Sequence, residues 1–195
     1  YVQNDFLKKL SFGYRANACN LDILKNKASV QNGKIVFAKT QQYSLLVLPD
    51  NKAMELETLQ RIAQLVKEGT VIYGPKPLTT FSLKGIKSKS ALIALADEVW
   101  GTTSAKDGSH AYGKGKVYWG SSVNEVIKQI NLAPDFCTGQ PDTLNLMYIH
   151  KKTNDADIYF VANQQNDTIT RECVFHVGKK NVEIWNPQYG SVITP

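Results

Sequence analysis

Apolar residues in the first two thirds of the chain alternate between short continuous runs and stripes with helical spacing. The clearest run, YSLLVL at residues 43–48, is apolar on both faces, as in a parallel strand buried between helices. A stripe with the i, i+3, i+4, i+7 spacing of one helix face follows at residues 59–66. Further strands are predicted at residues 70–73 and 116–119, each followed by another helical stripe. This order predicts a mostly parallel sheet flanked by helices.

Weaker signals precede this pattern. Residues 6–10 are expected to end an opening helix, and residues 14–19 are expected to form a strand. Asn20 is suited to cap a short helix, because its side-chain oxygen can accept a hydrogen bond from a free backbone N–H. The Asn32-Gly33 pair is a strong turn signal and predicts a hairpin that includes residues 34–37.

The pattern changes near Pro134. From Leu144 onward, short alternating strands are separated by turn residues, which is typical of an antiparallel sandwich. Four or five strands fit before the last residue, whereas a sandwich usually needs about seven. We therefore predict an α/β domain over residues 1–135 and an incomplete β-sandwich segment over residues 140–195. An incomplete sandwich leaves an apolar face or edge open, which would permit a homodimer through residues 144–195.

Composition excludes several classes of protein. The 195 residues include 43% hydrophobic and 21% charged residues, as in a soluble globular protein, and no apolar run is long enough for a membrane span. The formal net charge is +6, but the lysines are scattered, which argues against a nucleic-acid partner. The three cysteines lack metal-site spacing and are expected to be buried as small apolar residues: Cys19, Cys137 and Cys173.

Candidate ligand-binding residues lie after the predicted strands, where open parallel sheets hold their ligands. Asp50 could be an acid, a base or a metal ligand, although a turn or helix cap is the more common use of such a residue. Lys76 lies between two prolines and could meet an anion, or it could be an ordinary surface lysine. Ser121 follows a strand but lacks the G-x-S-x-G frame of a nucleophile. Tyr112 and Trp119 could stack on sugar rings.

Burial in the core is the more economical explanation for the large aromatic side chains, including Trp100 and Trp185. The glycines near Tyr112 do not form a phosphate-binding motif, so no cofactor is predicted. No histidine pairs visibly with a Cys or Ser, and no two carboxylates stand in a paired setting, so neither a catalytic residue nor a metal site is predicted.

Short motifs distributed from about Phe6 to Gly190 carry a family resemblance. They are KASVQNGKIV at 27–36, YSLLVLPD at 43–50, IYGPKP at 72–77, LADEVWG at 95–101, YGKGKVYWG at 112–120, APDF at 133–136, YIH at 148–150, DIYFVAN at 157–163 and VEIWNP at 182–187. In this order they resemble the region that follows the catalytic barrel in glycoside hydrolase family 106, the α-L-rhamnosidase-like proteins.

The resemblance implies a bacterial enzyme that degrades plant or other complex polysaccharides and is exported to the periplasm or the extracellular space. The α/β region would be similar to the class I glutamine-amidotransferase-like domain beside the barrel of several glycosidases, with its first strand upstream of Tyr1. The catalytic carboxylates of the family belong to the barrel, so none is transferred to this chain. The partners implied are the catalytic barrel of the same parent chain and its carbohydrate substrate.

Three functions compete at this point. The first is a non-catalytic accessory segment of a glycoside hydrolase. The second is a carbohydrate-binding module, which requires an exposed aromatic platform. The third is an independent amidotransferase-like or flavodoxin-like domain, which the missing nucleophile and phosphate loop oppose. The exposure of Trp100, Trp119 and Trp185 separates the first two.

Overall fold

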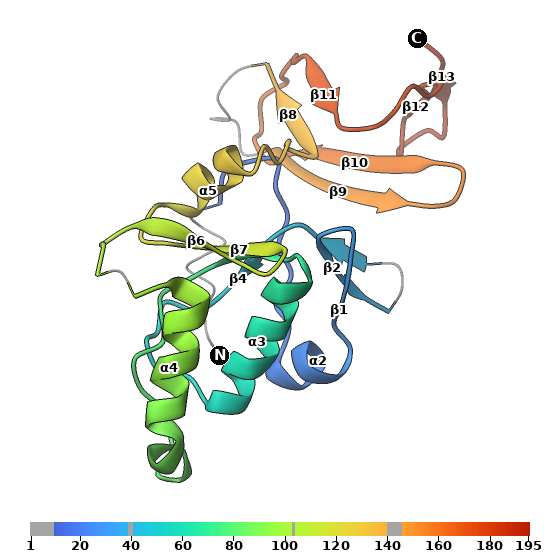
Figure 1. The fold of residues 1–195 in the computed structure, drawn as a ribbon. Coiled ribbons are helices and arrows are strands. Elements are labelled where there is room, and N and C mark those ends of the chain that lie inside the picture. Colours follow the sequence, from blue (N-terminus) through green and yellow to red (C-terminus); the bar gives the residue numbers. More distant parts are fainter. Residues whose placement is uncertain (1–9, 39–40, 103, 140–145) are drawn as a thin grey trace. The chain divides into compact units, whose positions relative to one another are not determined.

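The computed structural model describes residues 10–38, 41–102, 104–139 and 146–195 (Figure 1). The chain divides into two compact units. The first contains Ala16–Leu132, and the second contains Ser11–Arg15 and Ala133–Pro195. The helix end expected at residues 6–10 lies almost entirely outside the described residues.

A four-stranded sheet with the order β4-β5-β7-β6 organises the first unit. The first three of these strands are parallel, whereas β6 is antiparallel to β7. The strands are β4 (Leu46–Val47), β5 (Val71–Tyr73), β6 (Gly108–Tyr112) and β7 (Gly115–Trp119). Figure 1 shows α3 and α4 on one face of this sheet and α5 on the other. These helices are α3 (Leu56–Glu68), α4 (Lys89–Trp100), which follows the 3-10 turn η1 (Lys84–Ser88), and α5 (Val123–Gln129).

The start of the first unit is a short helix and a small antiparallel sheet. Asn20 caps the helix α2 (Leu21–Asn26) by accepting a hydrogen bond from the Ile23 N–H at 2.8 Å, as the sequence predicts. The sheet has the order β1-β2-β3 and consists of β1 (Ser29–Gln31), β2 (Lys34–Phe37) and β3 (Gln41–Tyr43). Asn32 and Gly33 have φ values of 51° and 75°, which is the geometry that an Asn-Gly hairpin turn provides.

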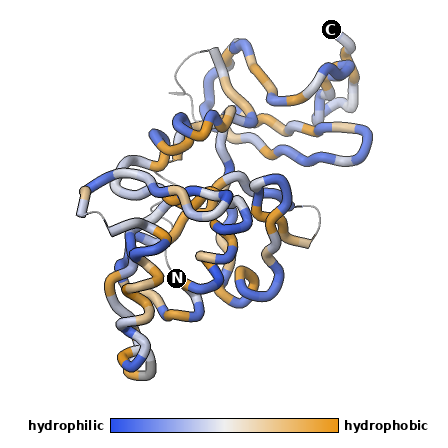
Figure 2. The backbone as a smooth tube through the Cα atoms, in the orientation of Figure 1, coloured by the Kyte–Doolittle hydropathy of each residue, from blue (hydrophilic) through white to orange (hydrophobic). Residues whose placement is uncertain are grey.

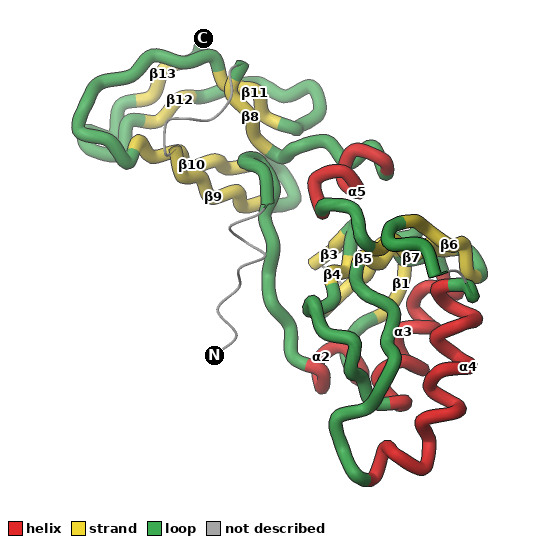
Figure 3. The backbone as a smooth tube through the Cα atoms, turned by 90° about the vertical axis from the view of Figure 1, so that its left-hand side faces the viewer, coloured by secondary structure: helices red, strands yellow, loops and turns green. Residues whose placement is uncertain are grey.

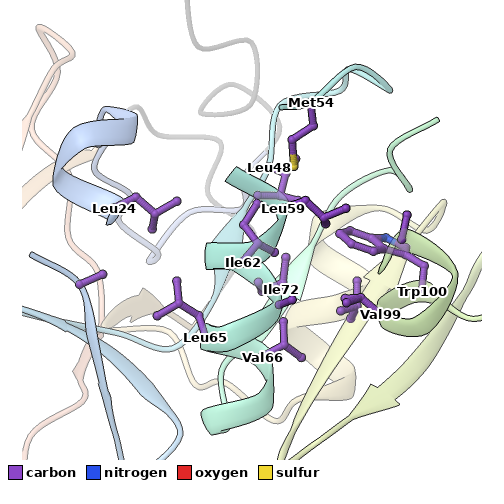
Figure 4. Packing of buried hydrophobic residues seen from close by; sticks show 14 of the residues in the cluster. Leu24, Leu48, Met54, Leu59, Ile62, Leu65, Val66, Ile72, Val99 and Trp100 are labelled. Carbon is purple, nitrogen blue, oxygen red and sulfur yellow. The ribbon is translucent and has the colours of Figure 1, made fainter. Parts of the chain in front are cut away.

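The core of the first unit lies between the buried face of α3 and the parallel sheet (Figure 4). Leu59, Ile62 and Val66 are fully buried and come from the apolar stripe that the sequence indicated. Ile72 of β5 packs against them from the sheet. Trp100, at the end of α4, is 1% exposed, and its indole N–H donates to the Gly74 carbonyl at 3.0 Å.

Two of the predicted strands differ in the structure. The run at residues 43–48 is divided between two sheets, because Tyr43 pairs with Ile35 in β2 whereas Leu46 pairs with Ile72 in β5. Residues 14–19 are extended but belong to none of the sheets in the described part of the chain.

The second unit contains three two-stranded antiparallel sheets (Figure 3). The longest is the hairpin of β9 (Leu146–Lys152) and β10 (Asp157–Asn163). The other pairs are β8 (Phe136–Thr138) with β11 (Cys173–Phe175) and β12 (Ile184–Trp185) with β13 (Val192–Ile193). Phe136 is fully buried and contacts the rings of Phe12, Tyr148 and Phe175 at centroid distances of 5.1–5.4 Å. This aromatic cluster is the apolar centre of the second unit.

Several expectations about burial are wrong. Cys19 and Cys173 are exposed and Cys137 is half-buried, so the cysteines are not core residues. Trp185 is 66% exposed because β12 and β13 pair only with each other and nothing among the described residues covers their faces. Trp119 is half-buried, and of the three tryptophans only Trp100 is buried as expected.

Candidate functional site

The five residues proposed from the sequence do not form one site. Asp50 is exposed in the turn after β4. The Lys76 ammonium pairs with Asp97 at 2.5 Å and donates to the Gly101 carbonyl at 2.6 Å, so both interactions attach the loop after β5 to the end of α4. The main-chain carbonyl of Ser121 accepts a hydrogen bond from the Tyr73 hydroxyl at 2.7 Å. These contacts explain Lys76 and Ser121 as structural residues.

Trp119 is the candidate that borders a hollow of about 470 Å³ in the first unit. Its indole N–H donates to the Ala105 carbonyl at 3.1 Å, which fixes the ring at one wall. The lining residues are Trp100, Gly101, Thr102, Ala105, Asp107, Gly108, Ser109, His110 and Trp119. Tyr112, the other aromatic candidate, packs instead against the core. The described lining contains one carboxylate, Asp107, and one imidazole, that of His110, whose Nδ1 lies 3.1 Å from the Val99 carbonyl oxygen.

A second constellation of polar groups lies in the second unit and is centred on His150. The register of the hairpin places His150 directly opposite Tyr159, and Lys152 opposite Asp157. Because side chains alternate along a strand, Tyr148 and His150 share one face of β9. Asp157 and Tyr159 share the matching face of β10. Neighbouring strand positions therefore create this cluster.

Both ring nitrogens of His150 face carboxylates. Nδ1 lies 2.9 Å from Asp135 Oδ1, and Nε2 lies 2.9 Å from Asp157 Oδ1. The imidazole can donate to both carboxylates only when both nitrogens carry a proton. Tyr159 stacks on the imidazole at a centroid distance of 4.0 Å, and its hydroxyl donates to Asp135 Oδ1 at 2.8 Å. Lys180 completes the cluster with an ion pair to Asp157 Oδ2 at 2.5 Å.

The electrostatics of the cluster favour an ionised Asp157 and neutral tyrosines. Hydrogen bonds from Lys180 and then His150 lower the pKa of Asp157 below its ordinary value. Burial, followed by the Asp135 carboxylate, raises the pKa of Tyr148 to about 12. Burial and the hydrogen bond to Asp135 also raise the pKa of Tyr159. The carboxylates of the cluster are therefore balanced by ion pairs and hydrogen bonds from neighbouring side chains of the same cluster.

This network lacks the geometry of a glycosidase carboxylate pair. In such a pair, the two carboxyl groups face each other across the bond that is cleaved, and one of them has a raised pKa so that it can act as a general acid. Here the imidazole of His150 fills the space between Asp135 and Asp157, and the pKa of Asp157 is lowered. The cluster therefore holds the hairpin to the segment before β8.

The spacing of four residues around a hairpin turn is a sequence signal for part of this cluster. His150 and Asp157 are separated by a short turn that includes Thr153-Asn154-Asp155, and Tyr148 and Tyr159 lie two residues further out on either side. In a hairpin this spacing puts all four side chains on one face. Asp135 could not have been assigned in this way, because its approach to His150 depends on tertiary packing.

We expect Asp157→Asn to destabilise the second unit at neutral pH and to flatten its loss of stability in acid. Because the folded-state pKa of Asp157 is lowered, its stabilisation is complete above the unfolded-state Asp pKa of about 3.9 and is lost as the pH falls through the folded-state pKa. Urea denaturation between neutral and acid pH measures this effect. Asp155→Asn, which removes the same charge from an exposed turn, is the matched control. Equal pH profiles for the two variants would contradict the assignment.

No group of His, Cys, Asp and Glu side chains suited to a metal ion occurs within residues 10–38, 41–102, 104–139 and 146–195. No helix among these residues has the length and apolar character needed to cross a bilayer.

Comparison with known proteins identifies the family. The profile of the alpha-L-rhamnosidase family, glycoside hydrolase family 106, matches residues 2–194. The chain belongs to glycoside hydrolase family 106. The resemblance carried by the sequence motifs is thus confirmed for nearly the whole chain.

Two relatives show how much of a family 106 protein this chain represents. It is 32% identical over 194 residues to a protein of Formosa agariphila named "Putative beta-glucuronidase", of which it covers 15%. It also shares its fold with a rhamnosidase from Novosphingobium sp. PP1Y, with a TM-score of 0.80 and 23% identity. That alignment covers 90% of this chain and 17% of the rhamnosidase. The chain therefore spans about a sixth of the length of these relatives.

Proposed function

We propose that this chain is a non-catalytic accessory segment of a family 106 glycoside hydrolase that acts on plant or other complex polysaccharides. The observation that carries the proposal is that the family profile matches nearly the whole chain, while the chain covers only 15% and 17% of the length of two relatives. Its expected partner is the catalytic barrel of the same parent chain. An exported enzyme, in the periplasm or outside the cell, fits the polymeric substrates of such a family.

The state of three acidic residues supports an accessory function. A glycosidase general acid needs a raised pKa, whereas the pKa values of Glu55, Glu125 and Asp157 are all lowered. The cause for Glu55 is first the Thr80 hydroxyl, and for Glu125 it is the backbone N–H of Ser122. Each of these carboxylates has a hydrogen-bonding function within the fold.

The fold class that we propose is consistent with this function. The parallel strands β4, β5 and β7, with helices on both faces, support a class I glutamine-amidotransferase-like or flavodoxin-like α/β fold for the first unit. The three short sheets of the second unit support a partial antiparallel β-sandwich. Gly74 and Pro75 follow β5, so the strand does not lead into a Cys or Ser nucleophile.

A carbohydrate-binding module is a second candidate, and Trp185 is the observation that favours it. This side chain and Tyr189 are both exposed, as an aromatic platform for sugars must be. The Trp185 indole N–H is held by Glu183 at 2.9 Å. Affinity electrophoresis in soluble polysaccharide, comparing the wild type with Trp185→Ala, distinguishes this candidate from a purely structural segment.

We expect the purified chain to hydrolyse aryl α-L-rhamnosides no faster than buffer. The reason is that Asp135 and Asp157 are both engaged by His150, so neither is available to a glycosidic bond. Release of the aryl group measured by absorbance tests this expectation. Turnover that persists through purification and disappears in Asp135→Asn or Asp157→Asn would contradict the proposed accessory function.

A further inference from the structure

The β9–β10 hairpin has two different faces. One face carries Tyr148, His150 and Tyr159 and is part of the aromatic and charged cluster described above. The opposite face carries Met147, Ile149, Ile158 and Phe160, which are each 51–61% exposed. We call these four residues the outer apolar face.

The register makes the outer apolar face continuous. Phe160 lies directly opposite Ile149, and Met147 and Ile158 occupy the next outward-facing positions along their strands. Figure 2 shows hydrophobic colour along parts of both strands of this hairpin. Contiguous apolar side chains of this size are uncommon on a free surface and mark an interaction site.

We propose that the outer apolar face is the docking surface for another segment of the same, longer polypeptide, which covers it as a second β-sheet layer. This inference rests on the proposed function as an accessory segment of a larger hydrolase. The opposite face of the hairpin is already occupied by the aromatic and charged cluster, so a layer on the outer apolar face would place the hairpin between two layers. Two packed sheets lie about 10 Å apart. A two-stranded hairpin is only marginally stable by itself, so a second layer would also stabilise β9 and β10.

The size of the relatives favours an occupant from the same polypeptide. The alignments to the Formosa and Novosphingobium proteins cover 97% and 90% of this chain but only 15% and 17% of those proteins. Each relative thus carries most of its mass outside this segment. The part of the polypeptide outside this segment is therefore large enough to supply the layer that covers the outer apolar face.

Charge disfavours a second copy of the chain as the occupant. Lys151 extends from the same face of β9 and lies opposite Ile158. The outward-facing positions of β9 and β10 within this patch carry no acidic side chain. A symmetric dimer would set the face against itself and place a lysine at both rims without an acidic partner. The occupant should therefore be apolar at its centre with an acidic group at the position that meets Lys151.

Methionine oxidation tests this proposal, because the chain has two methionines in contrasting environments. Met147 lies in the outer apolar face, whereas Met54 is buried in the core of the first unit. Dilute hydrogen peroxide followed by peptide mass spectrometry should oxidise Met147 rapidly in the 195-residue chain and Met54 slowly. In the polypeptide as its gene encodes it, the rate at Met147 should fall to that of Met54. Slow oxidation of Met54 in both samples is the control for folding.

Two other oxidation results would contradict the proposal. Equal rates at Met147 in both samples would show that the outer apolar face is open in the natural protein. Protection of Met147 that rises with the concentration of the 195-residue chain would identify a second copy as the occupant. Hydrolysis of rhamnosides by the chain alone would overturn the accessory function and would leave the oxidation result unaffected, so the two failures are distinguishable.

Discussion

Trp100→Ala should lower the free energy of unfolding of the first unit by about 3–5 kcal/mol, the range for removing a large buried aromatic side chain. Trp100 ends α4 and is 1% exposed within the main apolar core. Its removal leaves a cavity in the main apolar core and also leaves the Gly74 carbonyl without the indole donor. The two losses act on the same place in the core, where α4 meets the sheet.

Urea denaturation followed by far-UV circular dichroism measures this effect, because all the described helices belong to the first unit. Trp100→Phe retains most of the apolar volume but not the hydrogen bond, so its effect should be intermediate. Leu83→Ala removes an apolar side chain that is exposed, and it should change stability by less than about 0.5 kcal/mol. A Trp100→Ala midpoint close to that of Leu83→Ala would show that α4 does not depend on this contact.

The helices and turns of the first unit were largely predictable because their signals are local. The apolar stripe of α3 and the Asn20 cap of α2 require only neighbours along the chain. Ser122 and Glu125 likewise form a capping box at the start of α5, with the Glu125 carboxylate accepting from the Ser122 N–H at 2.7 Å. Each of these features depends on residues within one or two helical turns of each other.

Features that depend on distant partners were missed. The YSLLVL run gave no indication that Tyr43 and Leu46 join different sheets, because only pairing with Ile35 and Ile72 separates them. The strand β6 was also missed, since GSHAY has little apolar character and is ordered by its ladder with β7. Tertiary pairing determines both results and overrides local preference.

The candidate site residues show the same contrast between local sequence signals and contacts with distant partners. Lys76 follows a strand, as ligand-binding residues often do, but its ammonium is taken by Asp97 from α4. Trp185 has the apolar character of a core residue, yet its side chain is exposed. Its burial would require another layer of structure packed against β12, and a short sequence pattern does not show whether such a layer is present. The His150 cluster required both a hairpin register and the approach of Asp135, and only the first could have been predicted.

Phe136→Ala should be the most damaging substitution in the second unit, with a loss of about 3–5 kcal/mol. Phe136 is fully buried, and its ring contacts those of Phe12, Tyr148 and Phe175. It also pairs with Phe175 in the ladder of β8 and β11. Because the three sheets of this unit have two strands each, few other buried contacts are present to offset the loss.

The destabilisation by Phe136→Ala should extend beyond the aromatic cluster because of the residue before it. Asp135 precedes Phe136 and binds His150, so a displaced β8 would also weaken the polar contact to the β9–β10 hairpin. Hydrogen exchange should therefore show lost protection in β9 and β10 in Phe136→Ala, with α3 of the first unit unchanged. Phe175→Ala, which truncates a half-exposed ring of the same cluster, should have a smaller effect. Unchanged protection of the hairpin in Phe136→Ala would mean that the His150 network holds the second unit without the aromatic cluster.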